Sequence, residues 1–208
     1  MKCWPARLLA LLLLALVPAM ASAAAAATRA PARMPNEVEV EAAYLINFLR
    51  YTQWPTASFA TSTSPYVVTV VGSEQAATSV RAVASAAGAI GGHAIEVRWL
   101  PQARGTRELP FDSPKDLEAR EQLRGSHLVF FHRSAGQVHP QVLSDLAAWP
   151  VLTVSDNDDF TSQGGMLGLV RADQRIVFQA NTSAIRGAGL LVSAKVLKLA
   201  RADSRAVP

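Results

Sequence analysis

The pair formed by Ser155 and Asp156 is the first feature that could do chemistry, because a serine beside an acid can act as a nucleophile when a histidine approaches. His132 and His139 are the histidines that could approach it. No serine, however, has the Gly-x-Ser-x-Gly surroundings of a nucleophile elbow. Adjacent Ser and Asp more often form a turn through their side chains. We therefore expect no catalytic residue and no enzymatic activity.

The histidines are the next candidates, as metal ligands; they are His93, His127, His132 and His139. His127 and His132 are five residues apart on one predicted strand. Their side chains should therefore point to opposite faces of the sheet, and they cannot share a metal without a bulge. Scattered, solvated histidines are the simpler interpretation.

Acidic residues and cysteine give no clear metal site either. Asp156, Asp158 and Asp159 suggest calcium, but Leu167 stands where an EF-hand loop requires glutamate. The only cysteine, Cys3, lies in the N-terminal leader, so the mature chain should have no disulfide and no thiolate ligand. We expect no metal ion and no cofactor.

Two features could bind an anion. Gly164 and Gly165 close a polar loop, but they precede a predicted strand and so lack the context of a phosphate-binding loop. The backbone N–H groups after Asn181 could bind a carboxylate or a phosphate at the start of a helix. The alternative is a plain helix cap.

The elements that would position these residues alternate between strands and helices. The predicted strands are residues 66–71, 95–100, 128–131 and 151–155, and the predicted helices are residues 76–87, 113–125 and 140–148. This alternation indicates an α/β layered domain with right-handed parallel crossovers and flanking helices. Residues 166–170 and 175–180, joined by a tight turn, should form an antiparallel pair at the edge of the mainly parallel sheet.

The first helix is predicted to begin at Asn36, with Glu39 at the spacing of a capping box. Acidic residues in its first turns suit the helix dipole; they are Glu37, Glu39 and Glu41. An apolar stripe follows at helical spacing; its members are Val38, Ala42, Leu45 and Leu49. The element should end at Trp54, because the following residue is Pro55.

Tyr44, Phe48 and Tyr51 form an aromatic stripe beside the apolar one, and Trp54 follows. Core packing is one interpretation of these side chains. A surface that faces a partner is the other.

A long helix is predicted from Asn181 to about residue 200. Its apolar stripe has steps of three and four residues; the members are Ile185, Ala188, Val192, Val196 and Leu199. Gly187 and Gly189 would each destabilise a helix interior by roughly 1 kcal/mol. Close approach of the helix to the sheet would compensate.

The N-terminal segment has the pattern of a secretory signal peptide. Lys2 and Arg7 precede an apolar run at residues 8–17, and Ala21 and Ala23 offer small residues for cleavage. A transmembrane anchor is the alternative, but it needs roughly 20 apolar residues. We expect a signal peptide at residues 1–23, a disordered lead-in at 24–35, one domain at 36–202 and a tail at 203–208.

The charge balance gives no reason to expect nucleic acid as a partner. The chain has 20 basic and 16 acidic residues, and removal of Lys2 and Arg7 with the leader leaves 18 and 16. The basic residues are spread along the chain instead of forming one patch.

Several segments together resemble the YfiR family of periplasmic proteins. They are residues 42–48 with Trp54 and Pro55, the strand that ends at Gly72, residues 151–156, Gly164 with Gly165, residues 175–181 and residues 189–200. Each segment is short, but the ordered set is specific. The similarity covers about residues 38–201.

The resemblance implies a Rossmann-like α/β domain, often dimeric, that acts without catalysis. Such proteins hold a membrane-bound diguanylate cyclase of the YfiN type inactive from the periplasm, and an OmpA-like outer-membrane lipoprotein can sequester them. They thereby restrain cyclic-di-GMP signalling and biofilm formation. This chain departs from the family in lacking the disulfide cysteines, and residues 101–120 are a further departure, an insertion that could alter a binding face.

The leading hypothesis is therefore a periplasmic, homodimeric repressor of a YfiN-type cyclase. The alternative is a small-ligand sensor with a pocket near Asp156, Gly165 and Asn181. The residues expected to bind a partner or ligand are Tyr44, Phe48, Trp54, Asp156, Gly164, Gly165 and Asn181.

Overall fold

The computed structural model describes residues 35–101, 114–173 and 175–201. The predicted signal peptide, nearly all of the lead-in and the C-terminal tail lie outside these ranges. So do Ser113, the expected cap of one helix, and most of the 101–120 segment.

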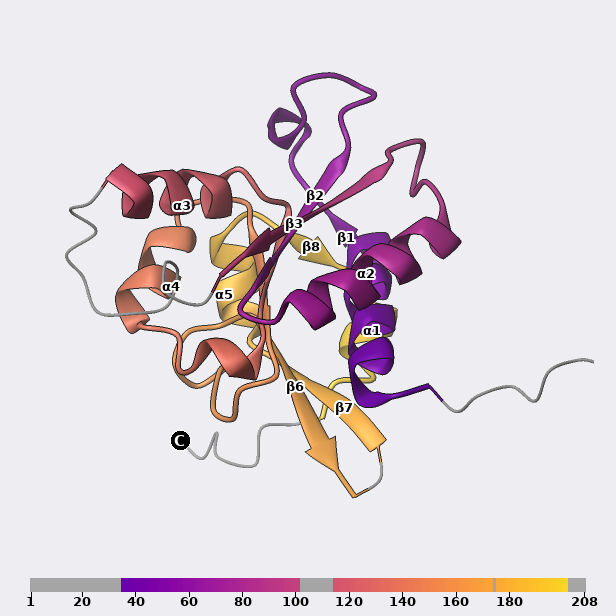
Figure 1. Cartoon of the computed structure of the whole chain (residues 1–208), viewed down its shortest axis with the longest axis vertical. Coiled ribbons are helices and arrows are strands. Elements are labelled where there is room, and N and C mark those ends of the chain that lie inside the picture. The colour runs from indigo at the N-terminus through magenta and orange to yellow at the C-terminus, as the bar shows by residue number, and fades with distance from the viewer. Residues whose placement is uncertain (1–34, 102–113, 174, 202–208) are drawn as a thin grey trace, which may run out of the picture. The chain divides into compact units, whose positions relative to one another are not determined.

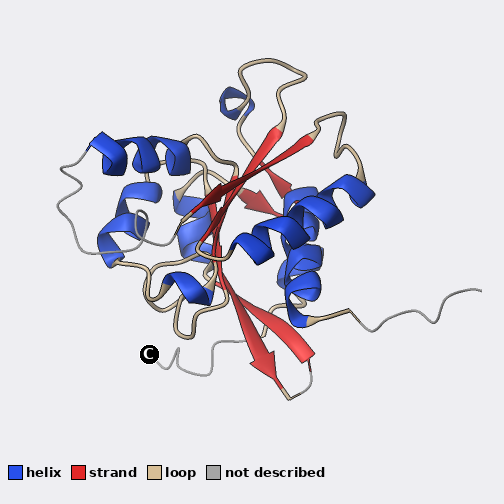
Figure 2. Cartoon of the chain, in the orientation of Figure 1, coloured by secondary structure: helices blue, strands red, loops and turns tan. Residues whose placement is uncertain are grey.

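A six-stranded sheet forms the centre of the domain (Figures 1 and 2). In spatial order its strands are β3 (Ile95–Leu100), β2 (Tyr66–Val71), β4 (Leu128–Phe131), β5 (Leu152–Ser155), β6 (Leu167–Ala172) and β7 (Arg175–Ala180). All neighbouring strands are parallel except β6 and β7, which pair antiparallel at one edge. The predicted α/β architecture, the parallel sheet and the antiparallel edge pair are thus confirmed.

Helices cover both faces of the sheet. The helices α1 (Glu37–Tyr51) and α2 (Glu74–Ala87) lie on one side, and α3 (Pro114–Arg124) and α4 (Pro140–Leu146) lie on the other (Figure 1). Alternate residues of β4 enter the two cores: Leu128 and Phe130 pack with α1 and α2, whereas Val129 and Phe131 pack with α3 and α4. This alternation follows from the pleat of a strand that is buried on both faces.

The start of α1 is the predicted capping box. The backbone N–H of Glu39 donates to Asn36 Oδ1, and the backbone N–H of Asn36 donates to Glu39 Oε2, both at 2.9 Å. The helix ends at Tyr51, three residues before the predicted end at Trp54. The reason is that Thr52 adopts an extended conformation and begins a short strand, β1 (Thr52–Gln53).

The prediction of one long C-terminal helix was wrong. The segment divides into α5 (Thr182–Gly187), β8 (Leu191–Val192) and α6 (Ala194–Leu197), and β8 pairs antiparallel with β1. Gly189, with φ +72°, ends α5: its N–H donates to Arg186 O at 3.0 Å, and the N–H of Leu190 donates to Ile185 O at 3.2 Å. These two bonds form a Schellman motif, in which glycine accepts a left-handed conformation that other residues resist.

Among the described residues, no helix combines the length and the hydropathy that a membrane span requires.

Candidate functional site

The candidate site lies at the carboxyl edge of the parallel strands. β2 has β3 on one side and β4 on the other, so the chain leaves β2 and β4 in opposite directions. This reversal is the place where ligands of open α/β sheets usually bind, outside the carboxyl ends of the strands. His132 follows β4, Asp156 follows β5, and α1 brings Glu41 to the same place.

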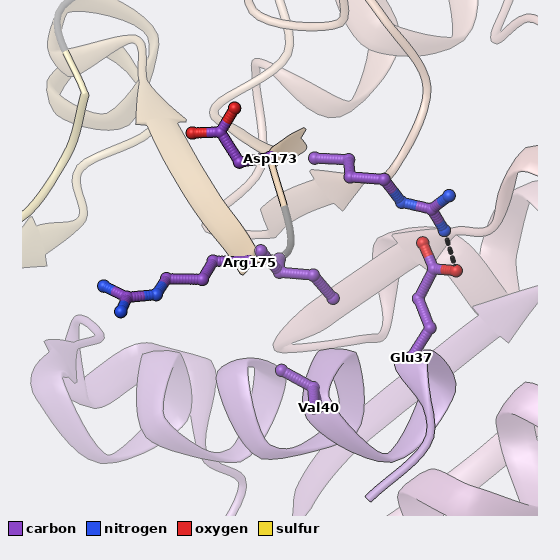
Figure 3. A pocket seen from close by; sticks show the side chains of 6 residues that line it. Glu37, Val40, Asp173 and Arg175 are labelled. Carbon is purple, nitrogen blue, oxygen red and sulfur yellow. Dashed lines mark hydrogen bonds and ion pairs between the residues drawn. The ribbon is translucent and has the colours of Figure 1, made fainter.

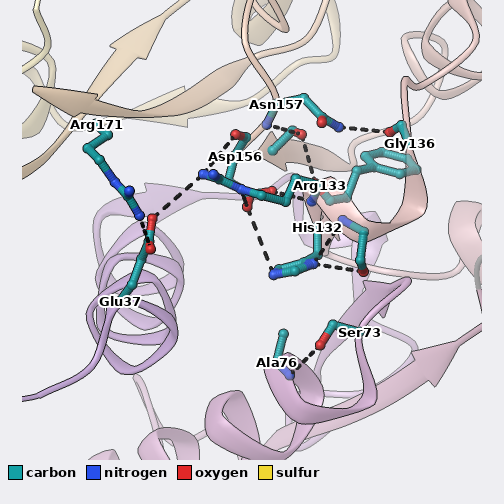
Figure 4. Close-up of polar contacts among 12 residues, drawn as sticks. Glu37, Ser73, Ala76, His132, Arg133, Gly136, Asp156, Asn157 and Arg171 are labelled. Carbon is teal, nitrogen blue, oxygen red and sulfur yellow. Dashed lines mark hydrogen bonds and ion pairs between the residues drawn. The ribbon is translucent and has the colours of Figure 1, made fainter.

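Asp156 is buried, with 3% of its surface exposed, and Arg133 holds its carboxylate. The backbone N–H of Arg133 donates to Asp156 Oδ1 at 2.5 Å, and Arg133 Nε donates to Oδ2 at 2.6 Å (Figure 4). Ser155 forms the expected side-chain turn, since its Oγ accepts the N–H of Asn157 at 3.0 Å and donates to Phe131 O at 2.7 Å. Both residues of the Ser-Asp pair therefore have a role in connecting the ends of β4 and β5.

Glu41 is a second buried carboxyl group at this edge, and no basic side chain among the described residues forms an ion pair with it. Only 3% of the residue is exposed, and within the described chain its Oε2 atom is buried without a hydrogen-bond partner. Burial, followed by the charges of Asp156 and Glu37, raises the pKa of Glu41 to about 8 from an ordinary 4.5. In the folded protein, this carboxyl group therefore favours its protonated form at neutral pH.

His132 completes the group. Its Nε2 atom lies 3.9 Å from Asp156 Oδ2, and its Nδ1 atom lies 2.9 Å from Ser134 Oγ. Burial lowers the pKa of His132, and the charge of Asp156 opposes that shift. One potential ligand atom from each of Glu41, His132 and Asp156 lies within 4.8 Å of the other two.

A chain of ion pairs continues from the cluster to the surface. Arg133 lies 3.7 Å from Glu37 Oε1, and Arg171 of β6 pairs with Glu37 Oε2 (Figure 4). Glu37 thereby links the start of α1 to the end of β4 and to the edge hairpin.

Beside Glu37 lies an open cavity of about 670 Å³, between α1 and the β6–β7 hairpin (Figure 3). Its lining residues are Glu37, Val40, Arg171, Asp173, Arg175 and Ile176. The sequence predicts a ligand pocket near Asp156, Gly165 and Asn181. None of these three residues lines this cavity.

Gly164, Gly165 and Asn181 form the connection between the 157–165 loop and the last elements of the chain. Gly164 has φ +102°, and a Cβ atom at Gly165 would lie 2.2 Å from the ring of Phe160. Asn181 caps α5, because its Oδ1 accepts the N–H of Ala184 at 3.0 Å, and its Nδ2 donates to Thr161 O at 3.1 Å. All three have a structural explanation in this arrangement, and a contact of theirs with a partner remains a prediction.

The aromatic residues expected at a partner surface are mostly packed inside. Phe48 is 2% exposed, and Tyr44 packs against Phe48 and Phe178 while its hydroxyl donates to Ile176 O at 2.8 Å. Trp54 is half-buried, and its Nε1 donates to His127 O at 3.2 Å. Tyr44 and Trp54 keep partial access to solvent, whereas Phe48 can only support a surface from beneath.

Acidification is expected to destabilise the domain through His127. Burial lowers the pKa of its imidazole to about 4 from an ordinary 6.5, so the unfolded chain takes up a proton that the folded protein does not. This contribution to stability is complete above pH 6.5 and is lost as the pH falls toward 4. At pH 4.5 the loss is roughly 2 to 3 kcal/mol in free energy of unfolding.

The variant His127→Asn tests this expectation, because an amide oxygen can replace Nδ1 as acceptor for the N–H of Val67, now bonded at 3.0 Å. Urea denaturation at pH 7 and pH 4.5 should show a smaller loss of stability in the variant than in the unchanged protein. Equal losses in the two proteins would show that other groups cause the acid sensitivity.

Sequence reasoning did not find Glu41, His132 and Arg133 as one group. Glu41 was interpreted through its charge near the start of a helix, and His132 was considered beside Ser155 and Asp156 only as part of a nucleophilic triad. A signal was present, because Glu41 is three residues after Val38 and four before Leu45 and so falls on the apolar stripe. A carboxyl group on a core-facing stripe is the feature that deserved a functional hypothesis.

The fold and the site define a layered α/β domain whose buried polar cluster lies at the carboxyl edge of the sheet, linked to the surface by ion pairs. Comparison with known protein families gives the assignment. Residues 38–201 match the family described as YfiR/HmsC-like (DUF4154). This range is nearly the whole described part of the chain. The chain therefore belongs to the YfiR/HmsC-like family, as the ordered sequence segments indicated. It is a regulatory family of the periplasm, and its known role is in cyclic-di-GMP signalling, through regulation of diguanylate cyclases.

Proposed function

We propose that this protein binds the periplasmic region of a membrane-bound diguanylate cyclase of the YfiN type and represses it. The observation that carries the proposal is the family match over residues 38–201. Repression would restrain cyclic-di-GMP synthesis and biofilm formation. The protein would reach the periplasm through cleavage of the signal peptide at residues 1–23, and an OmpA-like outer-membrane lipoprotein would relieve the repression by sequestering it.

The exposed apolar residues around β1 and β8 support contact with a partner at this end of α1. Tyr51 is 45% exposed and Leu191 is 64% exposed. They lie on adjoining segments, because Gln53 is paired with Leu191 and the N–H of Ser193 donates to Tyr51 O at 2.9 Å. Apolar side chains that gather in one place on a surface are typical of sites for protein contact. We place the cyclase, or the second subunit of a homodimer, at this surface together with the exposed part of Trp54.

Capture of the partner tests the proposal. A tagged chain without residues 1–23 is cross-linked to intact inner membranes, and the captured proteins are identified by mass spectrometry after detergent extraction. Recovery of a diguanylate cyclase is the expected result. The variant Leu191→Glu should reduce the recovery, whereas Leu117→Glu, which changes a leucine of α3 that is 50% exposed, should not. Recovery of no signalling protein by the folded wild-type chain would count against repression by direct contact.

A small-ligand sensor is the second candidate, and the cavity beside Glu37 is the observation that favours it. Its volume of about 670 Å³ lies within the range that small-molecule sites occupy. Its lining carries two basic residues, Arg171 and Arg175, and two acidic residues, Glu37 and Asp173, so a polar compound with charged groups would suit it. Such a ligand would raise the apparent melting temperature of the isolated domain, because it binds only the folded state.

A further inference from the structure

Three side chains from separate parts of the sequence meet on one face of the sheet. His132 continues the alternation of Leu128 and Phe130, and Asp156 continues that of Leu152 and Val154, toward the core that contains α1. Glu41 comes from α1 itself, so all three groups lie in the same layer.

The Oε2 atom of Glu41 is the feature that the described part of the fold leaves unexplained. The residue is 3% exposed, and within the described chain Oε2 is buried without a hydrogen-bond partner. A ligand atom of this carboxylate lies within 4.8 Å of those of His132 and Asp156. A buried polar atom without a partner requires a reason, and an ion is one of the usual ones.

We propose that Glu41, His132 and Asp156 bind one divalent transition-metal cation, for which Zn²⁺ is the best fit. One imidazole nitrogen and two carboxylate oxygens are a ligand set found around zinc, with water as the fourth ligand. The nitrogen argues against Ca²⁺ and Mg²⁺, which prefer oxygen ligands throughout.

The geometry requires only a small adjustment of the side chains. His132 Nε2 and Asp156 Oδ2 are 3.9 Å apart, and the widest separation in the group is below 4.8 Å. Ligands of a tetrahedral zinc site lie at about 2.0 to 2.2 Å from the metal, so the atoms must approach by roughly 1 Å. Rotation of the Glu41 and His132 side chains can supply that movement.

The hydroxyl group of Ser134 suits His132 as a metal ligand. Its Oγ lies 2.9 Å from Nδ1, and the backbone N–H of Ser134 donates to the same nitrogen at 3.1 Å. Binding would select the tautomer in which Nδ1–H donates to Ser134 Oγ, because that tautomer leaves the Nε2 lone pair directed toward the cluster; the bond from the backbone N–H would be given up. Metal-bound histidines are commonly held by such a hydrogen bond from the second ring nitrogen.

Arg133 is the competitor for this site. Its Nε donates to Asp156 Oδ2 at 2.6 Å, so the cation must replace the guanidinium at that oxygen. The side chain of Arg133 is 49% exposed and already approaches Glu37 at 3.7 Å, which gives it another partner when it is displaced. Metal binding would therefore rearrange the ion pairs that join α1 to the end of β4.

Calorimetric titration of the tag-free, chelator-treated mature protein with Zn²⁺ at a fixed neutral pH tests the proposal. We expect about one equivalent to bind. Glu41→Gln and His132→Ala should each weaken binding on the order of 100-fold, since each removes one of three protein ligands. Arg133→Gln should tighten binding several-fold, a result that a merely structural role of the cluster would not produce.

Two matched controls separate this site from general surface binding. Asp158→Asn removes an exposed carboxylate two residues after Asp156, and His139→Asn removes a histidine that caps α4. Both should leave the affinity unchanged within about twofold, and circular dichroism should show that every variant is folded. Absence of Zn²⁺ binding to the folded wild-type protein, or equal binding by the Glu41→Gln and His132→Ala variants, would overturn the proposal.

Discussion

Replacement of Glu41 by glutamine is expected to raise the free energy of unfolding of the metal-free protein by about 3 kcal/mol at pH 7. The pKa of this carboxyl group is about 8 in the folded protein, chiefly because of burial, against an ordinary 4.5. Folding at neutral pH must therefore either protonate Glu41 or bury its charge. Glutamine is close to the protonated form in shape and has no charge, so the variant avoids that loss.

The sign of the pH dependence distinguishes this effect from a general gain in packing. Because the folded pKa of Glu41 is raised, its contribution to stability is complete below pH 4.5 and is lost as the pH rises from 4.5 toward 8. Urea denaturation in the presence of a chelator should give nearly equal stabilities for the variant and the unchanged protein at pH 4.5. The difference should widen to about 3 kcal/mol by pH 7.

Glu118→Gln is the matched control, because it removes an exposed carboxylate from α3. Its effect should stay within about 0.5 kcal/mol at both pH values. A Glu41→Gln variant that is no more stable than the unchanged protein at pH 7 would show that Glu41 is not a strained buried acid. A confirmed gain would mean that the fold keeps a destabilising group, as functional sites often do.

Gly165→Ala is expected to lower the free energy of unfolding by about 2 to 3 kcal/mol, within the range for overpacking a core. An added Cβ atom would lie 2.2 Å from one ring carbon of Phe160 and 2.3 Å from the next. Phe160 is 2% exposed and packs in the core with α3 and α4, so the ring cannot move aside without disturbing its neighbours. Thermal and chemical denaturation would measure the loss.

The double variant with Phe160→Ala shows whether the clash is the cause. Removal of the ring should by itself destabilise the protein by about 3 to 5 kcal/mol, but Gly165→Ala should then add little. Gly187→Ala is the control, because a Cβ atom there would meet no atom within 4 Å. It should be neutral or slightly stabilising, since alanine favours helix over glycine. Additive losses in the double variant would contradict the assigned contact.

The elements with strong local signals could be predicted from the sequence. The strands β2, β3 and β4 have the predicted bounds, because each is a short run of mostly apolar or β-branched residues between turn residues. The capping box of α1 and the cap of α5 were also visible, since a cap depends on residues only three apart.

The C-terminal segment could not be predicted because its apolar spacing favours a helix, whereas its backbone conformation and its strand pairing interrupt one. The apolar spacing from Ile185 to Leu199 fits a helix, but Gly189 adopts a left-handed conformation, and β8 pairs with β1 from the other end of the chain. Periodicity does not report such a distant pairing.

The candidate site was only partly visible for a similar reason. Asp156 was expected at a binding location, and it lies at the carboxyl edge of the sheet. Its neighbours Glu41 and His132 are 115 and 24 residues away in sequence, so only the packing of α1 on the sheet and the order of the strands bring them together. For the aromatic residues the sequence showed the side chains but not their location; they are Tyr44, Phe48 and Trp54. Aromatic side chains at helical spacing look the same in the core as on a contact surface.

The most direct test of repression is the cellular concentration of cyclic-di-GMP, measured by mass spectrometry with and without this protein. Deletion of its gene should raise the concentration several-fold. A chain of residues 1–208 should restore the original level, whereas a chain without residues 1–23, which would stay in the cytoplasm, should not. An unchanged concentration after deletion, in cells shown to produce both the protein and a membrane-bound diguanylate cyclase, would contradict the proposed function.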